Sequence, residues 1–402
     1  MKKWLLIGGI ILVMGITASP FLIWQLKKPA DLNMLVIDKT VPDQTFREHQ
    51  GLMWMLNQAK VRKDGKPYEI SKDYAGFYPK GDKTYSIKSL PKTNSADMIY
   101  ITDTYGVYKE DLGVKAKRGD RSQLVYGGMT SEDVSYVKKA LNGRTKTLIG
   151  EFNTFGSPTS LDVRKELYEL YNVTWSGWIG RYFEEFGSEE VPAWVKSGYK
   201  KQYNKEWSLT GKGLLFVNES NKLVIITEKE LKENPVWFQY TKQGKKTLNL
   251  QDESAYQYWF DVITPQQKSD VQAQFVFHLD SEGKNKLKEN GIPLSIPAVV
   301  HHNKERYDTY YFAGDFADQG EVPSIYQTSF YPVWKKWTEK IGKEDESSFY
   351  WTVYLPLMNK IIDYQQNESQ PASVTFNKNM EIYEDADLKV AGKVGKDYLQ
   401  VY

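Results

Sequence analysis

The sequence predicts an α/β protein with a mostly parallel, flavodoxin-like sheet covered by helices on both faces. An N-terminal transmembrane helix precedes this sheet, and a small β-rich tail follows it. Three observations predict the architecture: a charge-free apolar run at the N terminus, apolar strands that alternate with helical segments, and a polar C-terminal stretch with short strand-like pieces.

The composition excludes several classes of protein. The 402 residues include 53 Lys and Arg against 51 Asp and Glu, a balance that offers no basic surface for nucleic acid. The chain has no cysteine, which excludes a disulfide, a thiolate zinc site, an iron–sulfur cluster and a cysteine nucleophile. Phosphate-binding glycine motifs are also absent, and we expect neither a metal nor a cofactor.

The segment Trp4–Leu26 contains no charged residue and has a lysine pair on each side. A helix of this length, at about 1.5 Å per residue, spans roughly 35 Å and is long enough to cross a bilayer. Trp4 and Trp24 lie near its ends, where aromatic side chains favour the interface. We therefore expect an uncleaved signal anchor in the lipid bilayer, with the bulk of a single-pass cell-membrane protein on the extracytoplasmic side.

A cleaved signal peptide is the alternative, with Ala18 and Ser19 as the small residues at the cut. The apolar stretch is long for such a peptide and continues beyond Ser19 as FLIWQL. Pro20 would also have to follow the cut directly. These features favour the anchor.

Strand and helix signals alternate after the anchor. The helix over 131–142 is the clearest, because Ser131 caps it, acids fill its first turn and Gly143 ends it. Residues 61–93 are rich in Lys, Gly, Pro and Tyr and predict a loop. The expected strands are 32–37, 98–102, 147–152, 213–217 and 223–227; the expected helices are 44–59, 131–142, 160–171 and 349–364; and a later unit runs over 270–279, 283–291, 296–301 and 310–313.

These elements suggest three domains. Residues 1–30 form the anchor, 31–364 form the α/β domain with insertions, and 365–402 form the β-rich tail. Division of the α/β domain into two lobes, 31–230 and 231–364, stays open.

Three predicted strands carry an acid at or near their carboxyl ends: Asp38, Asp103 and Glu151. Ligands of open parallel sheets bind at these ends, so the acids converge on one cleft if the strands are neighbours. Like charges there would raise one pKa and create an acid–base pair. Alternatively, such acids cap helices, bind loop amides or build a cation site, although the spacing matches no calcium loop.

A second group of residues follows an aromatic strand, which breaks at Gly314 into Asp315 and Asp318. We interpret this segment as a substrate-facing loop, and the nearby His301 and His302 bring imidazole within reach of it. Adjacent strand residues point to opposite faces, which argues against both histidines binding one metal. A structural turn with solvated acids is the alternative.

A third group lies in the aromatic-rich segment 173–186, which is a candidate platform for sugar rings. The alternative is a tryptophan-rich ridge that packs against the sheet. Taken over all three groups, the candidate ligand-binding residues are His49, Asn153, Trp175, Trp178, Arg181, Tyr182 and Asp318. The candidate catalytic carboxylates are Asp38, Asp103, Glu151 and Asp315.

Several motifs carry a resemblance to a known superfold. DKTVP at 38–42, REH at 47–49, MIYITDTYGVY and LIGEFNTFGSP resemble the class I glutamine amidotransferase-like superfold, in particular membrane-anchored branches without the catalytic cysteine. The resemblance covers about residues 31–227, and 270–318 would complete the sheet. It implies a cysteine at the elbow after the third strand. That elbow reads GEFNTFG here, which excludes amidotransferase chemistry and would leave Glu151 exposed.

The anchor, the missing nucleophile and the aromatic excess together favour a membrane-anchored extracytoplasmic protein. We expect it to bind or assemble cell-envelope components and to have a glycan-like ligand. Two alternatives stay open. One is a carboxylate-dependent hydrolase or glycosidase acting on an envelope polymer, with two acids about 5–5.5 Å or 6.5–9.5 Å apart. The other is an accessory subunit of a membrane transporter with a membrane-protein partner.

Overall fold

The computed structural model describes residues 2–114, 122–341 and 348–369. Its contacts divide the chain into two units, residues 1–362 and 363–402. The elements below belong to the first unit, except that helix α9 (Leu355–Ser369) continues into the second. The β-rich tail expected over 365–402 lies outside the described residues from 370 onwards.

A ten-stranded mixed sheet forms the centre of the first unit, in the order β14-β13-β16-β17-β18-β9-β6-β2-β4-β5. Strand β18 pairs in parallel with β9 and antiparallel with β17, so the sheet changes from parallel to antiparallel pairing at this strand. The strands are β2 (Met34–Asp38), β4 (Tyr74–Gly81), β5 (Thr84–Lys88), β6 (Met98–Ile101), β9 (Thr147–Gly150), β13 (Leu231–Tyr240), β14 (Ser254–Ala255), β16 (Val271–Leu279), β17 (Ser295–Lys304) and β18 (Tyr307–Phe312).

A second, four-stranded sheet is antiparallel throughout, in the order β12-β11-β10-β15. Its strands are β10 (Val173–Phe183), β11 (Gly213–Asn218), β12 (Leu223–Thr227) and β15 (Phe260–Pro265). Two further pairs are short: β1 (Ala30–Asp31) with β3 (Val61–Arg62), and β7 (Val107–Tyr108) with β8 (Leu124–Tyr126).

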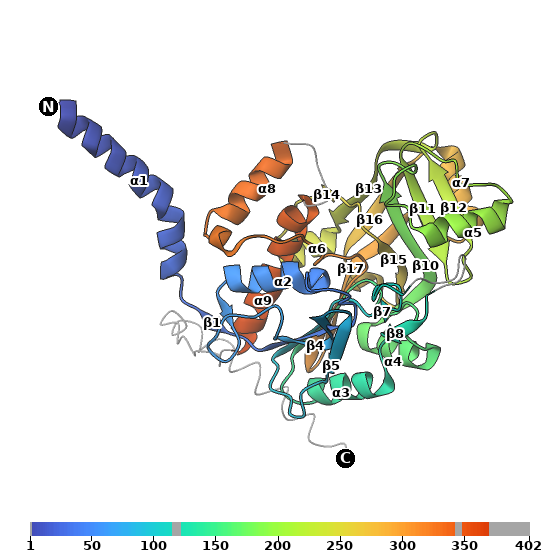
Figure 1. Ribbon diagram of the computed structural model, residues 1–402, viewed down its shortest axis with the longest axis horizontal. Coiled ribbons are helices and arrows are strands. Elements are labelled where there is room, and N and C mark those ends of the chain that lie inside the picture. Colours follow the sequence, from blue (N-terminus) through green and yellow to red (C-terminus); the bar gives the residue numbers. More distant parts are fainter. Residues whose placement is uncertain (1, 115–121, 342–347, 370–402) are drawn as a thin grey trace, which may run out of the picture. The chain divides into compact units, whose positions relative to one another are not determined.

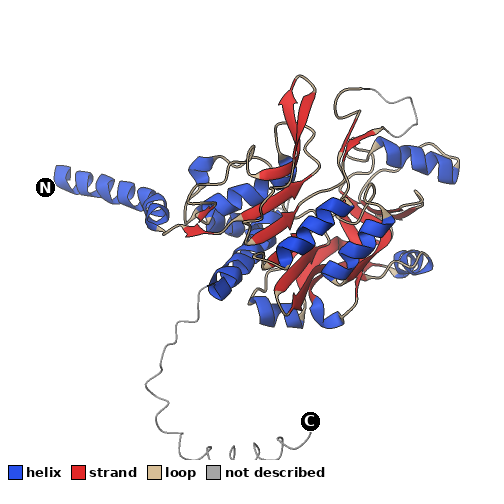
Figure 2. Ribbon diagram, turned by 90° about the horizontal axis from the view of Figure 1, so that it is seen from below, coloured by secondary structure: helices blue, strands red, loops and turns tan. Residues whose placement is uncertain are grey.

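Helices cover the large sheet, with α2 on one side of its parallel strands and α3 and α4 on the other (Figure 1). Figure 2 shows the same strands from a second direction, with helices packed on them. The cap of α3 is Thr130 rather than the predicted Ser131, and it forms a capping box with Asp133. The helices are α1 (Lys2–Leu26), α2 (Arg47–Gln58), α3 (Ser131–Leu141), α4 (Leu161–Tyr171), α5 (Ala193–Tyr203), α6 (Lys242–Leu248), α7 (Ser281–Glu289), α8 (Tyr331–Ile341) and the short turns η1 (Lys268–Asp270), η2 (Ser324–Tyr326) and η3 (Tyr350–Tyr354).

The predicted flavodoxin-like, amidotransferase-like fold with a mostly parallel sheet is wrong. Within the ten-stranded and four-stranded sheets of the described residues, only β4, β2, β6, β9 and β18 run parallel to a neighbour, and the other pairings are antiparallel. The physical reason is connection length, since the two residues between β17 and β18 allow a hairpin but no crossover. The loop expected over 61–93 also contains strands β4 and β5.

The predicted N-terminal transmembrane helix, or signal anchor, is also wrong. The segment does form helix α1, but within the described part of the chain no helix combines the length and apolarity needed to cross a bilayer. Thr17, Ser19 and Pro20 interrupt its apolar run in the second half. The end of α1 is bonded to the folded domain, because the Trp24 indole donates to the Gln58 carbonyl at 2.7 Å.

Candidate functional site

Four candidate carboxylates meet at one edge of the large sheet. Strands β2, β6, β9 and β18 are neighbours and parallel, so their carboxyl ends lie together. Asp38 ends β2, and Asp103, Glu151 and Asp315 follow β6, β9 and β18. The condition set from the sequence, that these strands be adjacent, is therefore met. Strand β18 adds the loop that carries Asp315 and Asp318, called the aspartate loop below, to the same edge.

Asp38 and His49 form a fully buried pair behind this edge. Asp38 Oδ2 lies 2.5 Å from His49 Nδ1, and its Oδ1 accepts from the Thr40 amide at 2.9 Å. His49 Nε2 lies 3.0 Å from the Ile70 carbonyl, which can only accept, so Nε2 carries a proton. The Nδ1–Oδ2 contact joins the imidazole directly to the carboxyl group. The pair fixes the first turn of α2 against β2.

Asp103 is held by three donors at the centre of the edge. The Thr40 hydroxyl and the Tyr105 amide donate to its Oδ1 at 2.7 and 2.6 Å, and the Asn153 side chain donates to Oδ2 at 2.9 Å. Burial raises the pKa of Asp103 to about 6, although these hydrogen bonds favour the ionised form. Asp103 therefore titrates near pH 6, and Asn153 orients it.

Glu151 is buried between β9 and the loop that follows β18. Its Oε1 accepts from the Tyr100 hydroxyl at 2.6 Å and from the Ala317 amide at 3.1 Å. Burial raises the pKa of Glu151 well above its usual value, and both hydrogen bonds oppose the shift. The elbow that the sequence places at Glu151 is thus closed to solvent, and Glu151 fastens the aspartate loop to the sheet.

Glu48 is a member of this cluster that sequence reasoning missed. It lies in the first turn of α2, where Arg47 Nη2 donates to its Oε1 at 2.7 Å. Its Oε2 is buried and has no hydrogen-bond partner among the residues that the structure describes. Burial raises the pKa of Glu48 well above its usual value, and the negative charge of Asp103 adds to the shift. The available signal was its position beside His49 in the REH motif.

Asp315 and Asp318 are the acids of the cluster that reach solvent. Both are partly exposed, whereas Glu48, Asp103 and Glu151 are buried. Burial and then the surrounding carboxylates raise the pKa of Asp315 well above its usual value. Burial also raises the pKa of Asp318, but the positive charges of Arg47 and Arg181 oppose that shift. The pKa of both aspartates is thus raised, but arginine charges limit the rise at Asp318.

Asp261, on β15, is a second missed acid. It is fully buried, and its Oδ2 accepts from the Tyr311 hydroxyl at 2.5 Å. Burial raises the pKa of Asp261 to about 7. Asp261 does not follow any of the strands expected from the sequence, so nothing in the sequence indicated that it lies near Asp103.

The predicted sugar platform is packed into the core. Trp175 and Trp178 are each 8% exposed, Tyr182 is buried as well, and the Trp175 indole donates to the Trp178 carbonyl at 2.8 Å. This matches the alternative of a packing ridge. Arg181 does lie near the acids, where its charge acts on Asp318, and its Nη2 lies 3.2 Å from a Glu190 carboxylate oxygen.

The two histidines that precede the aspartate loop pair with other acids. His301 Nε2 lies 2.7 Å from Asp308, and His302 Nδ1 lies 2.8 Å from Asp270. Among the described residues, no group of three or more His, Asp or Glu side chains is arranged to hold a metal ion.

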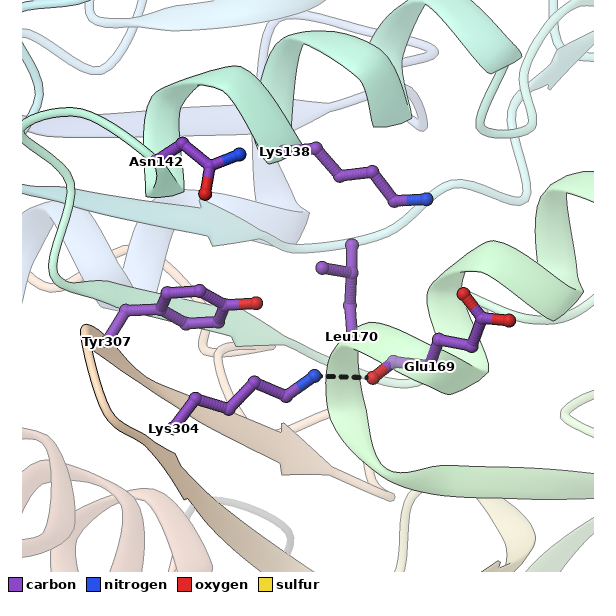
Figure 3. Close-up of a pocket in the computed structure, with 6 residues that line it drawn as sticks. All are labelled: Lys138, Asn142, Glu169, Leu170, Lys304 and Tyr307. Atoms are coloured by element: carbon purple, nitrogen blue, oxygen red, sulfur yellow. Dashed lines mark hydrogen bonds between the residues drawn. The ribbon is translucent and has the colours of Figure 1, made fainter. Parts of the chain in front are cut away.

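A pocket of about 270 Å³ lies at the opposite edge of the sheet, where β17 ends and β18 begins (Figure 3). There the Lys304 ammonium donates to the Glu169 carbonyl at 2.7 Å and so caps the end of α4. The pocket lies at the amino end of β18, whereas Asp315 follows the carboxyl end of that strand. Its lining residues are Lys138, Asn142, Glu169, Leu170, Lys304 and Tyr307.

Comparison with known proteins gives little. The sequence matches no protein-family model and no curated protein. Two weakly similar solved structures are Agd3, described as a novel carbohydrate deacetylase, and the exo-β-1,4-mannosidase Op5Man5 from Opitutaceae bacterium strain TAV5.

Agd3 is 12% identical, with a TM-score of 0.30, over 83% of this chain and 33% of its own. The mannosidase is 8% identical, with a TM-score of 0.31, over 82% of this chain and 36% of its own. The chain thus spans about a third of the length of each. Likenesses this weak carry no argument, and neither supports the amidotransferase-like interpretation.

Proposed function

We propose that the protein is a carboxylate-dependent hydrolase that cleaves glycosidic bonds, with Asp315 and Asp318 as its acid–base pair. One observation carries the proposal. Asp315 and Asp318 lie in one loop and are partly exposed beside buried acids; the pKa of both is raised, but neighbouring carboxylates add to the rise at Asp315 whereas Arg47 and Arg181 oppose it at Asp318. Pairs of this kind supply the acid and the base of many hydrolases.

Asp315 is suited to be the general acid. Burial and then the neighbouring carboxylates raise its pKa well above the usual value, which favours the protonated form. A protonated carboxyl group can donate to the departing glycosidic oxygen as the carbon–oxygen bond breaks.

Asp318 is suited to be the partner carboxylate. Arg47 Nε lies 3.6 Å from its Oδ1, and the positive charge favours the ionised form. In a direct hydrolysis, water adds to the sugar carbon and gives one proton to Asp318, while the leaving oxygen takes the proton of Asp315. Atoms and charges then balance without a cofactor.

The surrounding residues keep the loop in place. Glu151 binds the Ala317 amide between the two aspartates, and the Asp315 amide donates to the Trp259 carbonyl at 3.3 Å. Both contacts join the loop to residues that flank strands β9 and β15, which is the support that a precise acid–base pair needs.

The test is hydrolysis of a panel of aryl glycosides and oligosaccharides by the full chain and its variants. Asp315→Asn should lower kcat/KM for poor leaving groups by about 10²–10⁴-fold and spare activated leaving groups, which need no acid. Asp318→Asn should slow both. Asp162→Asn is the control, because that side chain is 94% exposed on α4.

Two results would overturn the proposal. One is an Asp315→Asn variant with the wild-type rate on poor leaving groups. The other is a protein that binds glycans and hydrolyses none of the panel, which would instead fit a binding component.

A further inference from the structure

A stacked pair of tryptophans, one of them exposed, lies beside the four-stranded sheet. Trp194, in the first turn of α5, stacks on Trp259, which precedes β15, with ring centroids 6.2 Å apart and planes inclined by 27°. Trp194 is 40% exposed and Trp259 is partly exposed. The positions of α5 and β15 can be followed in Figure 1. Trp194 therefore leaves apolar ring area accessible to solvent, unlike the buried Trp175 and Trp178.

The backbone joins this pair directly to the aspartate loop. The Trp259 carbonyl accepts from the Asp315 amide at 3.3 Å and from the Tyr256 hydroxyl at 2.9 Å. The next residue, Phe260, forms an antiparallel bridge with Gly314. The backbone of Trp259 is therefore hydrogen-bonded to Asp315, the residue proposed as the general acid.

Side chains make a second connection, toward Asp318. Trp259 packs edge-on against Phe183, with centroids 6.0 Å apart. The Arg181 guanidinium lies 4.8 Å from the centre of the Phe183 ring, and its charge also acts on Asp318. The tryptophan pair and the two aspartates thus adjoin through the backbone on one side and through Phe183 and Arg181 on the other.

We propose that Trp194 and Trp259 form a sugar-binding subsite that holds a pyranose ring of the substrate next to the Asp315–Asp318 pair. The inference rests on the proposed hydrolase function and adds its substrate class, an oligosaccharide that extends beyond the cleaved bond. A pyranose presents one face of C–H groups, and an exposed indole buries that face without leaving a polar group unpaired. The stacked partner and the loop contacts hold the indoles in place, so little side-chain freedom is lost on binding.

The experiment compares Trp194→Ala with Trp334→Ala, which removes a tryptophan of similar exposure, 42%, from α8. Binding of oligosaccharides is measured by calorimetry in the Asp315→Asn background, and KM is measured in the otherwise wild-type chain. Trp194→Ala should weaken binding and raise the oligosaccharide KM by about two- to tenfold, the range expected for one aromatic contact. It should leave the KM of a monosaccharide aryl glycoside unchanged. Trp334→Ala should change neither, and Trp194→Tyr should restore most of the affinity.

The outcomes separate this inference from the proposed function. Oligosaccharide hydrolysis with the same KM in Trp194→Ala and wild type overturns the subsite and leaves the hydrolase intact. Trp194-dependent glycan binding without any hydrolysis supports the subsite and overturns the hydrolase. Absence of both binding and hydrolysis overturns both. If Trp194→Ala lowers the melting temperature, the conservative Trp194→Tyr and Trp194→Phe variants decide, because an aromatic ring must then restore affinity.

Discussion

The buried Asp38–His49 pair makes an asymmetric prediction about stability. In His49→Leu, Asp38 loses the group 2.5 Å from its Oδ2 and remains as an uncompensated buried charge. Breaking a buried pair in this way costs about 3–5 kcal/mol of unfolding free energy. In Asp38→Asn, by contrast, the new amide can donate to Nδ1 of a neutral His49, while its oxygen still accepts from the Thr40 amide. That variant should lose no more than about 1 kcal/mol.

The double variant sharpens the argument. Asp38→Asn with His49→Leu leaves one amide unpaired, which costs about 1–3 kcal/mol. Adding Asp38→Asn to His49→Leu should therefore restore part of the lost stability. Simple loss of contacts would instead lower the stability further.

The assay is urea unfolding of the full chain at pH 7, followed by tryptophan fluorescence and circular dichroism. The midpoint should shift while the slope stays constant. A loss below about 1 kcal/mol in His49→Leu would refute the reasoning, as would an equal loss in Asp38→Asn. A double variant less stable than His49→Leu would refute it too.

Two further predictions concern the same edge of the sheet. Burial raises the pKa of Asp261 to about 7 from 3.8, so the folded state keeps a proton that the unfolded state has lost between these values. Stability is therefore lost as pH rises through that window, by up to about 4 kcal/mol, and Asp261→Asn should gain more over wild type at pH 8 than at pH 4 in urea titrations. An equal gain at both pH values contradicts this. Gly51→Ala would place a methyl group 2.5 Å from the Ala317 carbonyl and 2.8 Å from the Tyr350 ring. It should cost about 1–3 kcal/mol and disturb the aspartate loop. Gly320→Ala, where nothing lies within 4 Å, is the control, and equal melting temperatures for the two variants would speak against the clash.

Local patterns in the sequence predict the central parallel strands and their helices well. The strands expected at 32–37, 98–102 and 147–152 appear as β2, β6 and β9, and the helices at 44–59, 131–142 and 160–171 appear as α2, α3 and α4 with small shifts at their ends. Buried runs and capping signals are short-range, and a single sequence shows them.

Strand direction and long-range pairing are a different matter. β10 carries two tryptophans and Arg181, so its composition indicated a ligand platform rather than a strand with one buried face. Which strands pair antiparallel depends on connections and partners that no local pattern specifies.

The candidate site was predicted only in part, because local patterns do not show which distant residues come together. Asp38, Asp103 and Glu151 follow recognisable strands, so their meeting could be anticipated from the carboxyl-end rule. Glu48 and Asp261 lack such a signal, because their role comes from burial against acids distant in the chain. Side-chain exposure, which separates Trp194 from Trp175, also appears only once the fold is known.

The double pairing of β18 has a consequence for the order in which the protein matures. Asp38, Asp103 and Glu151 are synthesised early, but the aspartate loop follows a strand that pairs with β9 on one side and β17 on the other. A nascent chain that ends before β17 holds the three buried acids without the loop that Glu151 fastens. The proposed acid–base pair therefore assembles only when both halves of the sheet have joined, and a fragment released during synthesis would be inert.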